Sequence, residues 1–408
     1  MNGFQRMVVC ATTILIGGCS TATTADSGTV DATDGSEASI DPHADAALDS
    51  LPCMPSVTTP VDESIHSLLH IDTDAGTSII ADPSVFYPAG SAAGALSYSV
   101  VPTQASIRTS VAVSADNGAH WSFVADANTP SPATMSLTGI PGCAGGGCTG
   151  AIVNETSSIV FDPTDPDPMR AWKIFTHRYV VANVPMHGLV PWYPYGHIAM
   201  FTAPLPRGPW AGPAVIAGWP SATPFSSDGA AYVSTSDPGT AACLIFGEPG
   251  ATVAPDGSLH LALGCATGAL ASPSFDIVLL RSTDHAASWH YVSTPLHGAD
   301  GDCYGGAGRM NAADLFVAGG REYLMATPEP AQGRTGCVVF PFDDTSAGTV
   351  AINPVRYLQP VVPSGQVEYA GACTFAEGAS AMGYTMSRVH FELMPPELHE
   401  IATGIDTP

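Results

Sequence analysis

The sequence predicts an all-β domain, and its repeats fit a β-propeller of four-stranded antiparallel blades. The 408 residues include 42 glycines and 36 prolines, which suits a chain with many ordered turns. Short runs rich in β-branched and aromatic residues recur between these turns, whereas long helical periodicity is hard to find. Repeats of this kind imply a radial array of typically about 4 to 8 blades. We count five units and favour five blades, with six as the alternative because residues 125–153 could hide further strands.

Two eight-residue segments predict hairpins in the first and third units. They share the pattern S-x-D-x-G-x-x-W, carried by Ser114, Asp116, Gly118 and Trp121, and by Ser282, Asp284 and Trp289 with Ala286 at the glycine position. The Asp can accept backbone N–H groups, the Gly supplies a positive φ, and the Trp is a large apolar plug. If Ala286 is left-handed, it costs on the order of 1 kcal/mol. The pattern resembles the Asp-box, or BNR repeat, of sialidase-like β-propellers, which supports the architecture without selecting an activity.

The first 18 residues are predicted to be a lipoprotein signal peptide. One positive charge precedes the mostly apolar run 7–16, and the Ile16-Gly-Gly-Cys19 sequence resembles the lipobox of bacterial lipoproteins. The run is shorter than the roughly 20 residues that a membrane-spanning helix needs. The resemblance implies lipidation at Cys19 and a place in the bacterial cell envelope, either on the outer membrane or exposed at the surface. Contact with the membrane would then be through the lipid alone.

Residues 19–66 are predicted to be a disordered acidic tether, and residues 67–408 the propeller domain. The tether has nine acidic residues and no Lys or Arg. The whole chain has a net charge of −25, which disfavours nucleic acid as a partner. A carbohydrate or glycoconjugate is the more natural partner, and we expect a monomer that requires no cofactor. A structural Ca²⁺ among the acidic turns is a further expectation without assigned ligands.

The cysteines predict disulfides rather than a metal cluster. Eight of the ten remain once Cys10 leaves with the signal peptide and Cys19 is lipidated. Their number is even, the context is exported, and no C-x-x-C pair occurs. Two pairs are expected from proximity, namely Cys143 with Cys148 and Cys243 with Cys265.

Carboxylates recur at or near the starts of the inner strands. Four units offer Asp82, Glu155, Glu248 and Glu368, and the fourth unit has Asn311, preceded by Arg309. Because inner strands line the central channel of a propeller, these groups should converge on one pocket. Converging carboxylates push their pKa values apart, so one can stay protonated as an acid while another acts as a base.

This arrangement resembles the five-bladed furanosidase clan, which includes family 43 arabinanases and xylosidases and the levanase and invertase relatives. The resemblance implies that Asp82 is the general base and Glu248 the general acid of an inverting glycoside hydrolase. The clan has an Asp in its second blade that tunes the acid, and here Glu155 and Asp162 are alternatives for that role. In an inverting enzyme the two carboxyl groups lie about 6.5 to 9.5 Å apart. The turn Gly208-Pro209-Trp210 resembles one seen in these glycosidases.

Further polar residues are candidates for binding substrate, namely His177, Arg178, Arg309 and Tyr369. A non-catalytic propeller that binds sugar or protein at the cell surface is the alternative to an enzyme. An exo-sialidase is disfavoured, because its three carboxylate-binding arginines could only be assembled from Arg108, Arg178, Arg309 and Arg388 with nothing to select them. The sequence contains no H-E-x-x-H, G-x-S-x-G or P-loop pattern, which disfavours metalloprotease, α/β-hydrolase and nucleotide chemistry.

Overall fold

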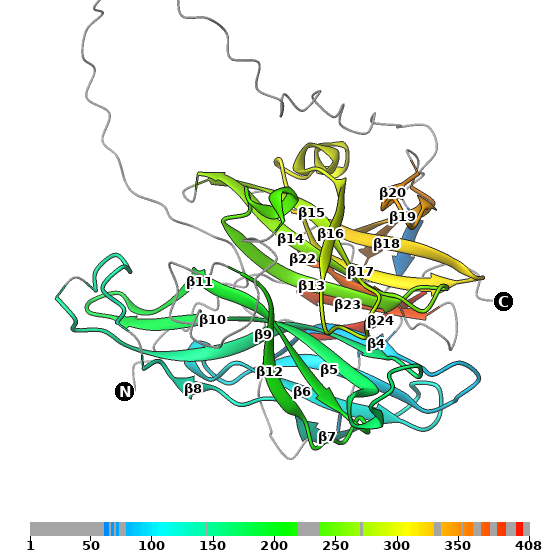
Figure 1. The fold of residues 1–408 in the computed structure, drawn as a ribbon, viewed down its shortest axis with the longest axis horizontal. Coiled ribbons are helices and arrows are strands. Elements are labelled where there is room, and N and C mark those ends of the chain that lie inside the picture. The colour runs from blue at the N-terminus through cyan, green and yellow to red at the C-terminus, as the bar shows by residue number, and fades with distance from the viewer. Residues whose placement is uncertain are drawn as a thin grey trace, which may run out of the picture.

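The computed structural model describes most of residues 61–402 as antiparallel β-sheets arranged as a propeller (Figure 1). The predictions for the signal peptide, for Cys19 and for most of the tether lie outside the described residues. These residues exclude 1–60, 65–66, 69–70, 73–78, 135, 144, 219–236, 270–271, 330–335, 352–353, 362–368, 376–381, 389–396 and 403–408.

The first and second sheets contain the N-terminal half of the propeller. The first has the order β3-β7-β6-β5-β4, and the second has the order β12-β11-β10-β9-β8. The strands of the first are β3 (Ile71–Asp72), β4 (Ile79–Phe86), β5 (Gly94–Val101), β6 (Arg108–Ser114) and β7 (Trp121–Asp126). Those of the second are β8 (Ser131–Pro132), β9 (Thr149–Phe161), β10 (Trp172–Val184), β11 (Gly188–Ala203) and β12 (Ala211–Gly218).

Three further sheets complete the array, in the orders β13-β14-β15-β16, β1-β21-β19-β18-β17 and β2-β24-β23-β22. The third contains β13 (Ile245–Val253), β14 (Leu259–Ala269), β15 (Ser272–Ser282) and β16 (His290–Leu296). The fourth contains β1 (Val61–Ser64), β17 (Met310–Ala318), β18 (Arg321–Pro328), β19 (Cys337–Asp344), β20 (Thr349–Val350) and β21 (Arg356–Val361). The last contains β2 (Ser67–Leu68), β22 (Tyr369–Phe375), β23 (Met382–Arg388) and β24 (Glu397–Ala402).

The prediction of an all-β propeller is confirmed. The favoured count of five blades is corrected, because the structure describes four blades with most of their side chains and a fifth sheet mainly by its strand pairing. The strands described within the stretch 125–153 are the end of β7, β8 and the start of β9; β8 pairs with β9 and forms no separate blade. Strand β1 lies inside the range predicted as a tether and pairs in parallel with β21.

The inner strands β4, β9, β13, β17 and β22 each contain one β-bulge with a non-glycine residue at positive φ. These residues are Asp82 (50°), Thr156 (47°), Glu248 (46°), Ala312 (46°) and Ala372 (49°). The pairing with the next strand shifts register at each of these points. Left-handed backbone is uncommon for residues other than glycine, and such strain is often found at functional sites. The bulges therefore define one equivalent position on every inner strand.

Hydrogen bonds between neighbouring inner strands join the sheets two residues after four of the five bulges. Ser84 Oγ accepts from the Ile159 N–H (3.0 Å), and Ser158 Oγ accepts from the Ala251 N–H (2.9 Å). In the same way, an Asp314 oxygen accepts from the Phe375 N–H (2.9 Å) and Thr374 Oγ1 accepts from the Val85 N–H (3.4 Å). The last of these bonds connects the C-terminal sheet back to the first.

Gly250 occupies the equivalent position of β13, where the neighbouring backbone leaves no room for a side chain. A Cβ there would collide with the Ala313 backbone and lie 2.5 Å from the Asp314 Cα. Replacing Gly250 by Ala is expected to lower the free energy of unfolding by about 1 to 3 kcal/mol, because β13 and β17 must separate. Urea unfolding measures this loss. The matched control is Gly147→Ala, where nothing lies within 4 Å of an added Cβ; equal stability of the two variants would contradict the close approach.

The apolar core lies between neighbouring sheets rather than at one centre. One cluster joins Phe175 and Ile198 of the second sheet to Phe246 and Leu261 of the third, and similar clusters occupy the other interfaces. The two expected disulfides, Cys143–Cys148 and Cys243–Cys265, are both confirmed. A third, Cys337–Cys373, links β19 to β22 and so crosses from one sheet to the next.

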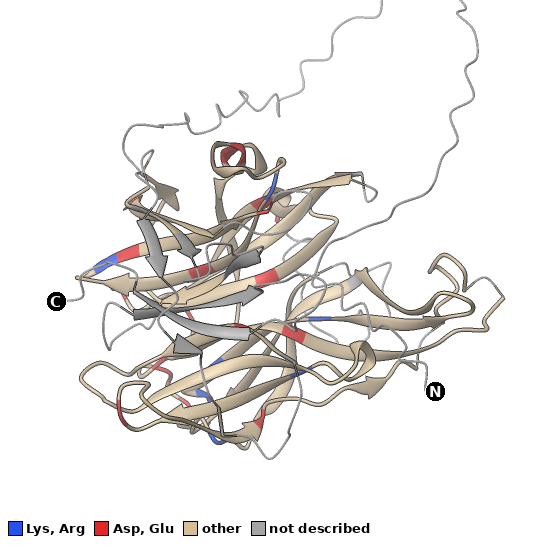
Figure 2. Ribbon diagram, turned by 180° about the vertical axis from the view of Figure 1, so that it is seen from behind, with Lys and Arg blue, Asp and Glu red and all other residues tan. Residues whose placement is uncertain are grey.

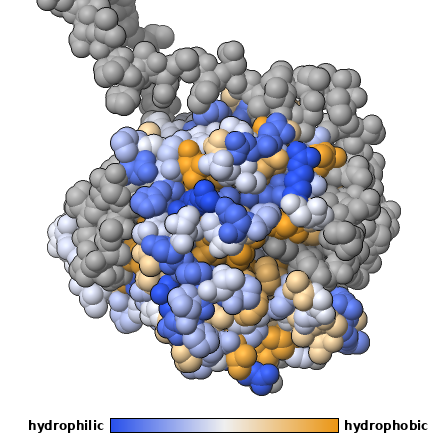
Figure 3. Space-filling model, turned by 45° about the vertical axis from the view of Figure 1, so that its right-hand side comes forward, coloured by the Kyte–Doolittle hydropathy of each residue, from blue (hydrophilic) through white to orange (hydrophobic). Residues whose placement is uncertain are grey.

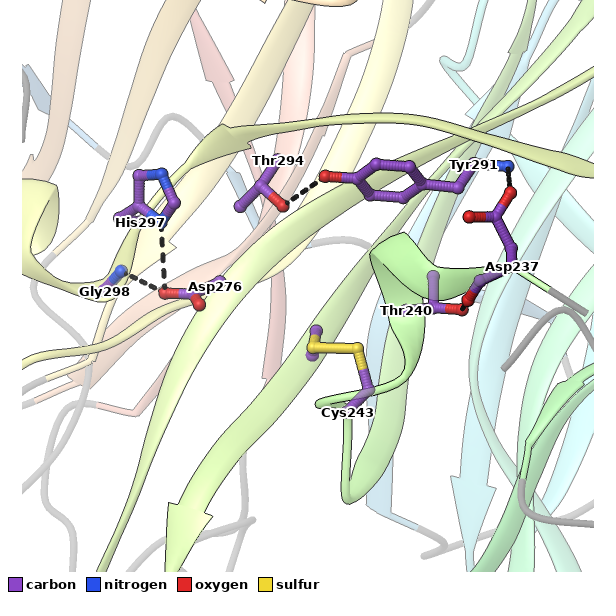
Figure 4. Close-up of a disulfide and its surroundings, with 9 residues drawn as sticks. Asp237, Thr240, Cys243, Asp276, Tyr291, Thr294, His297 and Gly298 are labelled. Atoms are coloured by element: carbon purple, nitrogen blue, oxygen red, sulfur yellow. Dashed lines mark hydrogen bonds and ion pairs between the residues drawn. A yellow bond between two sulfur atoms is a disulfide. The ribbon is translucent and has the colours of Figure 1, made fainter. Parts of the chain in front are cut away.

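The Cys243–Cys265 disulfide lies beside the short helix η4 (Pro238–Thr240), as Figure 4 shows. Asp237 holds this segment against the third sheet, because one carboxylate oxygen accepts from the Gly239 N–H (3.0 Å) and the other from the Tyr291 N–H (3.1 Å). The other short helices are η1 (Gln104–Ser106), η2 (Pro168–Arg170) and η5 (Gly298–Tyr304).

The two predicted hairpins have matching geometry. In the first, Ser114 Oγ accepts from the Gly118 N–H (2.8 Å), and an Asp116 oxygen accepts from the His120 N–H (3.0 Å). The second repeats these bonds with Ser282, Ala286, Asp284 and Ser288. The positive φ expected at Ala286 is present, at 68°. Trp121 and Trp289 are both buried, as expected of apolar plugs.

Acidic residues outnumber basic ones and lie scattered over the strands and loops (Figure 2). On the face in Figure 3, apolar groups form small areas among hydrophilic residues. Among the described residues, no helix has both the length and the apolar character needed to cross a membrane.

Candidate active site

Asp82 and Glu248 occupy the bulges of the first and third inner strands. Both side chains belong to almost fully buried residues, 8% and 5% exposed respectively, and each residue is followed by proline. Both also line the same central cavity, which has a volume of about 30 Å³, enough for a water molecule. The structure therefore brings together the two residues that the sequence predicted as base and acid.

All five inner strands contribute to this central cavity. Its lining consists of Asp82, Pro83, Ser84, Thr156, Ser157, Ser158, Glu248, Pro249, Ala312, Ala313, Asp314, Ala372 and Cys373. Asp314 is a third buried carboxyl in it, and burial raises its pKa from about 3.8 to about 7. A carboxyl with such a pKa is neutral below neutral pH.

A second cavity adjoins the first at Glu248, which lines both. Its lining consists of His177, Tyr193, Ile245, Gly247, Glu248, Phe275, Arg309, Asn311 and Glu329. Asn311 Nδ2 donates to Glu329 Oε2 (3.2 Å), and the Arg309 guanidinium lies over the Phe275 ring, 5.6 Å from its centre. This cavity contains groups that can donate to and accept from sugar hydroxyls.

His177 was expected to bind substrate, and the structure places it in the second cavity. Its ring lies against Tyr179 and stacks on Tyr193, with ring centres 4.9 and 5.6 Å apart respectively. Burial lowers the pKa of His177 to about 3, so the imidazole is neutral at physiological pH. His177 can therefore offer a hydrogen bond but no positive charge.

The second blade departs from the predicted triad. Thr156, rather than Glu155, occupies the bulge equivalent to Asp82 and Glu248. Glu155 lies one residue earlier and accepts a hydrogen bond of 2.5 Å from the Tyr179 hydroxyl. Its carboxylate is among the charges that raise the pKa of Tyr179, after burial as the main cause. Glu155 is thus near the site without lining either cavity.

Asp162, the alternative to Glu155, lies at the far end of β9 in a buried charge cluster. Lys173 Nζ lies 3.3 Å from an Asp162 oxygen and 2.8 Å from an Asp165 oxygen, and His285 Nδ1 lies 2.9 Å from Asp162. Neither cavity is lined by Asp162. Asp162, Asp165 and His285 are close enough together to hold a metal ion. The Lys173 ammonium already supplies the positive charge there, so these residues do not fit the expected structural Ca²⁺.

The other predicted binding residues are dispersed. Arg309 lines the second cavity, whereas an Arg178 nitrogen lies 3.3 Å from His197 Nε2 and lines neither cavity. Tyr369 lies on the inner strand β22, and its side chain is outside the described part of the chain. Arg108 pairs with Asp126 at 3.1 Å. Of the described arginines, Arg309 alone lines these two cavities, so an arginine triad is not assembled there.

Thr156, Asp314 and Glu329 were not identified from the sequence. Glu329 precedes a proline, as Asp82 and Glu248 do, and that dipeptide is a weak signal. Acidic residues also precede proline at 162, 165, 167 and 237, where the structure shows turns or strand ends. The dipeptide alone cannot select the residues that reach a cavity.

Comparisons with known proteins give structural likeness only. No family model matches the sequence, and no curated protein matches it either. Among solved structures, a Hadza microbial sialidase is 12% identical with a TM-score of 0.42, over 78% of this chain and 57% of that one. The catalytic domain of a Coprinopsis cinerea family-62 α-L-arabinofuranosidase is 11% identical with a TM-score of 0.48, over 85% and 98%. A thermostable family-43 glycoside hydrolase is 12% identical with a TM-score of 0.48, over 82% and 96%.

The chain spans 57% of the sialidase and 52% of a Bacillus licheniformis family-43 protein. At these identities the likeness concerns the outline of the fold alone.

Proposed function

We propose that this chain is a glycan-active propeller that hydrolyses a glycosidic bond in its central cavity. The observation that carries the proposal is that Asp82 and Glu248 occupy equivalent bulges on the first and third inner strands and line one cavity. Two carboxyl groups flanking the scissile bond are the usual machinery of glycoside hydrolysis.

In this mechanism, Asp82 accepts a proton from the attacking water, and Glu248 donates a proton to the leaving oxygen. The water attacks the anomeric carbon from the face opposite the leaving group, so the bond forms with inversion. The central cavity has room for such a water, and Glu248 reaches both this cavity and the adjoining one. The hydroxyl of Thr156, which has no hydrogen-bond partner among the described residues, can orient the water or a sugar hydroxyl.

The test is turnover of a panel of aryl glycosides by the wild-type chain and by Asp82→Asn and Glu248→Gln. Loss of the general acid or base is expected to lower kcat/KM by about 10²- to 10⁴-fold. The matched control is Asp343→Asn, an exposed carboxylate that pairs with Arg321 at 3.5 Å, and it should retain wild-type turnover. Unchanged turnover in either cavity variant would remove that residue from the mechanism.

The second candidate is a non-catalytic propeller that binds sugar. Thr156 favours it, because the second blade places a hydroxyl where the predicted triad needs a carboxylate. In that case the wild-type chain would bind glycans in calorimetric titration without hydrolysing any aryl glycoside, and Glu248→Gln would change affinity only.

We also propose export and lipidation at Cys19, which would place the propeller at the cell envelope. The support is the lipobox-like sequence before Cys19. Mass spectrometry of the chain expressed in a bacterial host tests this proposal, since a diacylglycerol adduct on Cys19 should be absent from Cys19→Ser.

A further inference from the structure

A large groove lies between the first and second sheets, beside the first hairpin, and we call it the hairpin groove. Its volume is about 860 Å³, within the range of about 300 to 1,000 Å³ that is usual for small-molecule sites. Its walls are the β4–β5 turn, the first hairpin, the β9–β10 connection and the β11–β12 turn. Phe161 lines the groove at the end of β9, roughly 17 Å along the strand from the Thr156 bulge. The groove shares no lining residue with the two cavities of the candidate active site.

Flat apolar rings make up much of the groove lining. Phe161 is partly exposed, and its ring packs against that of Trp172 with the ring centres 5.0 Å apart. Leu205 is 51% exposed beside them. The lining also includes Pro88, Pro163, Pro168, Pro204 and Pro206. One face of a sugar ring consists largely of C–H groups, so packing it on such rings removes apolar surface from water.

The polar groups of the groove suit a ligand without charge. Its two carboxylates are already bound, since Asp116 lies 2.6 Å from His120 Nδ1 and Asp165 lies 2.8 Å from Lys173 Nζ. Arg207 is exposed and pairs with none of the described carboxylates, so its guanidinium is available to donate to hydroxyl oxygens. A polyanion would meet the Asp116 carboxylate, which is 45% exposed. A neutral molecule with many hydroxyls meets no such repulsion.

The backbone around the groove does not offer a peptide an edge to extend. Strand β6 pairs with both β5 and β7, and strand β10 pairs with both β9 and β11. In the first hairpin, the Gly118 and His120 N–H groups donate to Ser114 and Asp116. A peptide that binds by adding a strand needs unpaired backbone groups. Side-chain rings and hydroxyl-binding groups therefore favour a sugar over a peptide.

We propose that the hairpin groove is a non-catalytic binding site for a segment of a neutral glycan chain. This inference goes beyond the proposed function, because the groove is separate from the central cavity. It binds a glycan whether or not Asp82 and Glu248 hydrolyse one.

The test is electrophoresis of the full chain in native gels that contain arabinoxylan, xyloglucan, β-glucan or galactan, all neutral polysaccharides. At least one of them should retard the wild type, and Leu205→Asp and Arg207→Ala should each raise the Kd obtained from the mobility by tenfold or more. The matched controls are Leu189→Asp and Arg321→Ala, an exposed leucine and an exposed arginine outside the groove, and both should be retarded like the wild type. Thermal unfolding shows that each variant is folded.

The proposal would be overturned if none of the four polysaccharides retarded the wild type, or if the groove variants were retarded equally. Retardation by polygalacturonate alone would contradict the neutral class of ligand. A change from dimer to monomer in the sedimentation of Leu205→Asp would instead make the groove an interface between two copies of the chain. A chain that is retarded through the groove but turns over no aryl glycoside would retain this binding site and reject the proposed hydrolysis, and turnover without retardation would do the reverse.

Discussion

Asp162→Asn is expected to lower the free energy of unfolding by about 1 to 3 kcal/mol, because it removes one of the two carboxylates that contact a buried ammonium. The Lys173 and Asp162 side chains are both 0% exposed, and Asp165 is 1% exposed. The cluster also joins two blades. His285 belongs to the hairpin of the third sheet, and its ring contacts Asp162 while its backbone carbonyl accepts a hydrogen bond from Arg170 (3.1 Å). Urea unfolding at neutral pH measures the loss.

The matched control for this substitution is Asp343→Asn, which removes an exposed ion pair and should cost less than about 1 kcal/mol. If the two variants were equally stable, the cluster would not hold the blades together. Turnover per folded molecule should be unaffected in Asp162→Asn, because Asp162 lines neither cavity.

Lowering the pH should weaken the buried cluster of Asp162, Asp165 and Lys173. Burial opposes ionisation of Asp162, but hydrogen bonds from His285 and Thr164 and the charge of Lys173 outweigh it and lower its pKa. The pKa of Asp165 is also lowered, with burial outweighed by its bonds to Lys173 and to the Asp167 N–H. Groups with a depressed pKa in the folded state stabilise it above their unfolded pKa of about 3.9, and this contribution is lost as the pH falls further.

The contribution of the Asp314 carboxyl to the free energy of unfolding is expected to have the opposite pH dependence to that of Asp162 and Asp165, and Asp314→Asn removes it. Burial raises the pKa of Asp314 to about 7, so between about pH 4 and pH 7 the unfolded chain releases a proton that the folded chain retains. The wild type therefore loses stability across this window, by at most about 4 kcal/mol for a shift of about three pH units. Asn keeps an oxygen for the Phe375 N–H and does not titrate.

The stability of Asp314→Asn relative to the wild type should accordingly rise between pH 4.5 and pH 8.5. Urea unfolding at both values measures the difference, with Gly147→Ala as a variant whose relative stability should not change with pH. A constant difference between Asp314→Asn and the wild type would show that the Asp314 carboxyl is not held neutral by burial.

Local patterns were sufficient to predict much of the fold. The two hairpins, the burial of both tryptophans and two disulfides depend on residues close in sequence or on adjacent strands, and all are confirmed. The placement of Asp82 and Glu248 in one cavity was also predicted, because both lie in the first half of an apolar inner strand.

The second and fourth blades could not be predicted in the same detail. A bulge shifts the register by one residue, and only the pairing of β9 with β10 shows that Thr156 takes the position that Glu155 was expected to hold. Glu329 lies beyond the end of β18, so its approach to Glu248 depends on the packing of two blades rather than on any repeat in the sequence.

The most direct test of the assignment of Asp82 as base and Glu248 as acid is the dependence of kcat on the leaving group. Two glycosides of the sugar that the aryl glycoside panel identifies are compared. A dinitrophenolate leaves with little protonation of the leaving oxygen, whereas a poorly acidic alcohol leaves only when its oxygen is protonated. Glu248→Gln should retain turnover of the first within about tenfold and lose about 10²- to 10⁴-fold on the second, while Asp82→Asn should lose activity on both. An equal loss on both substrates in Glu248→Gln would contradict its role as the acid.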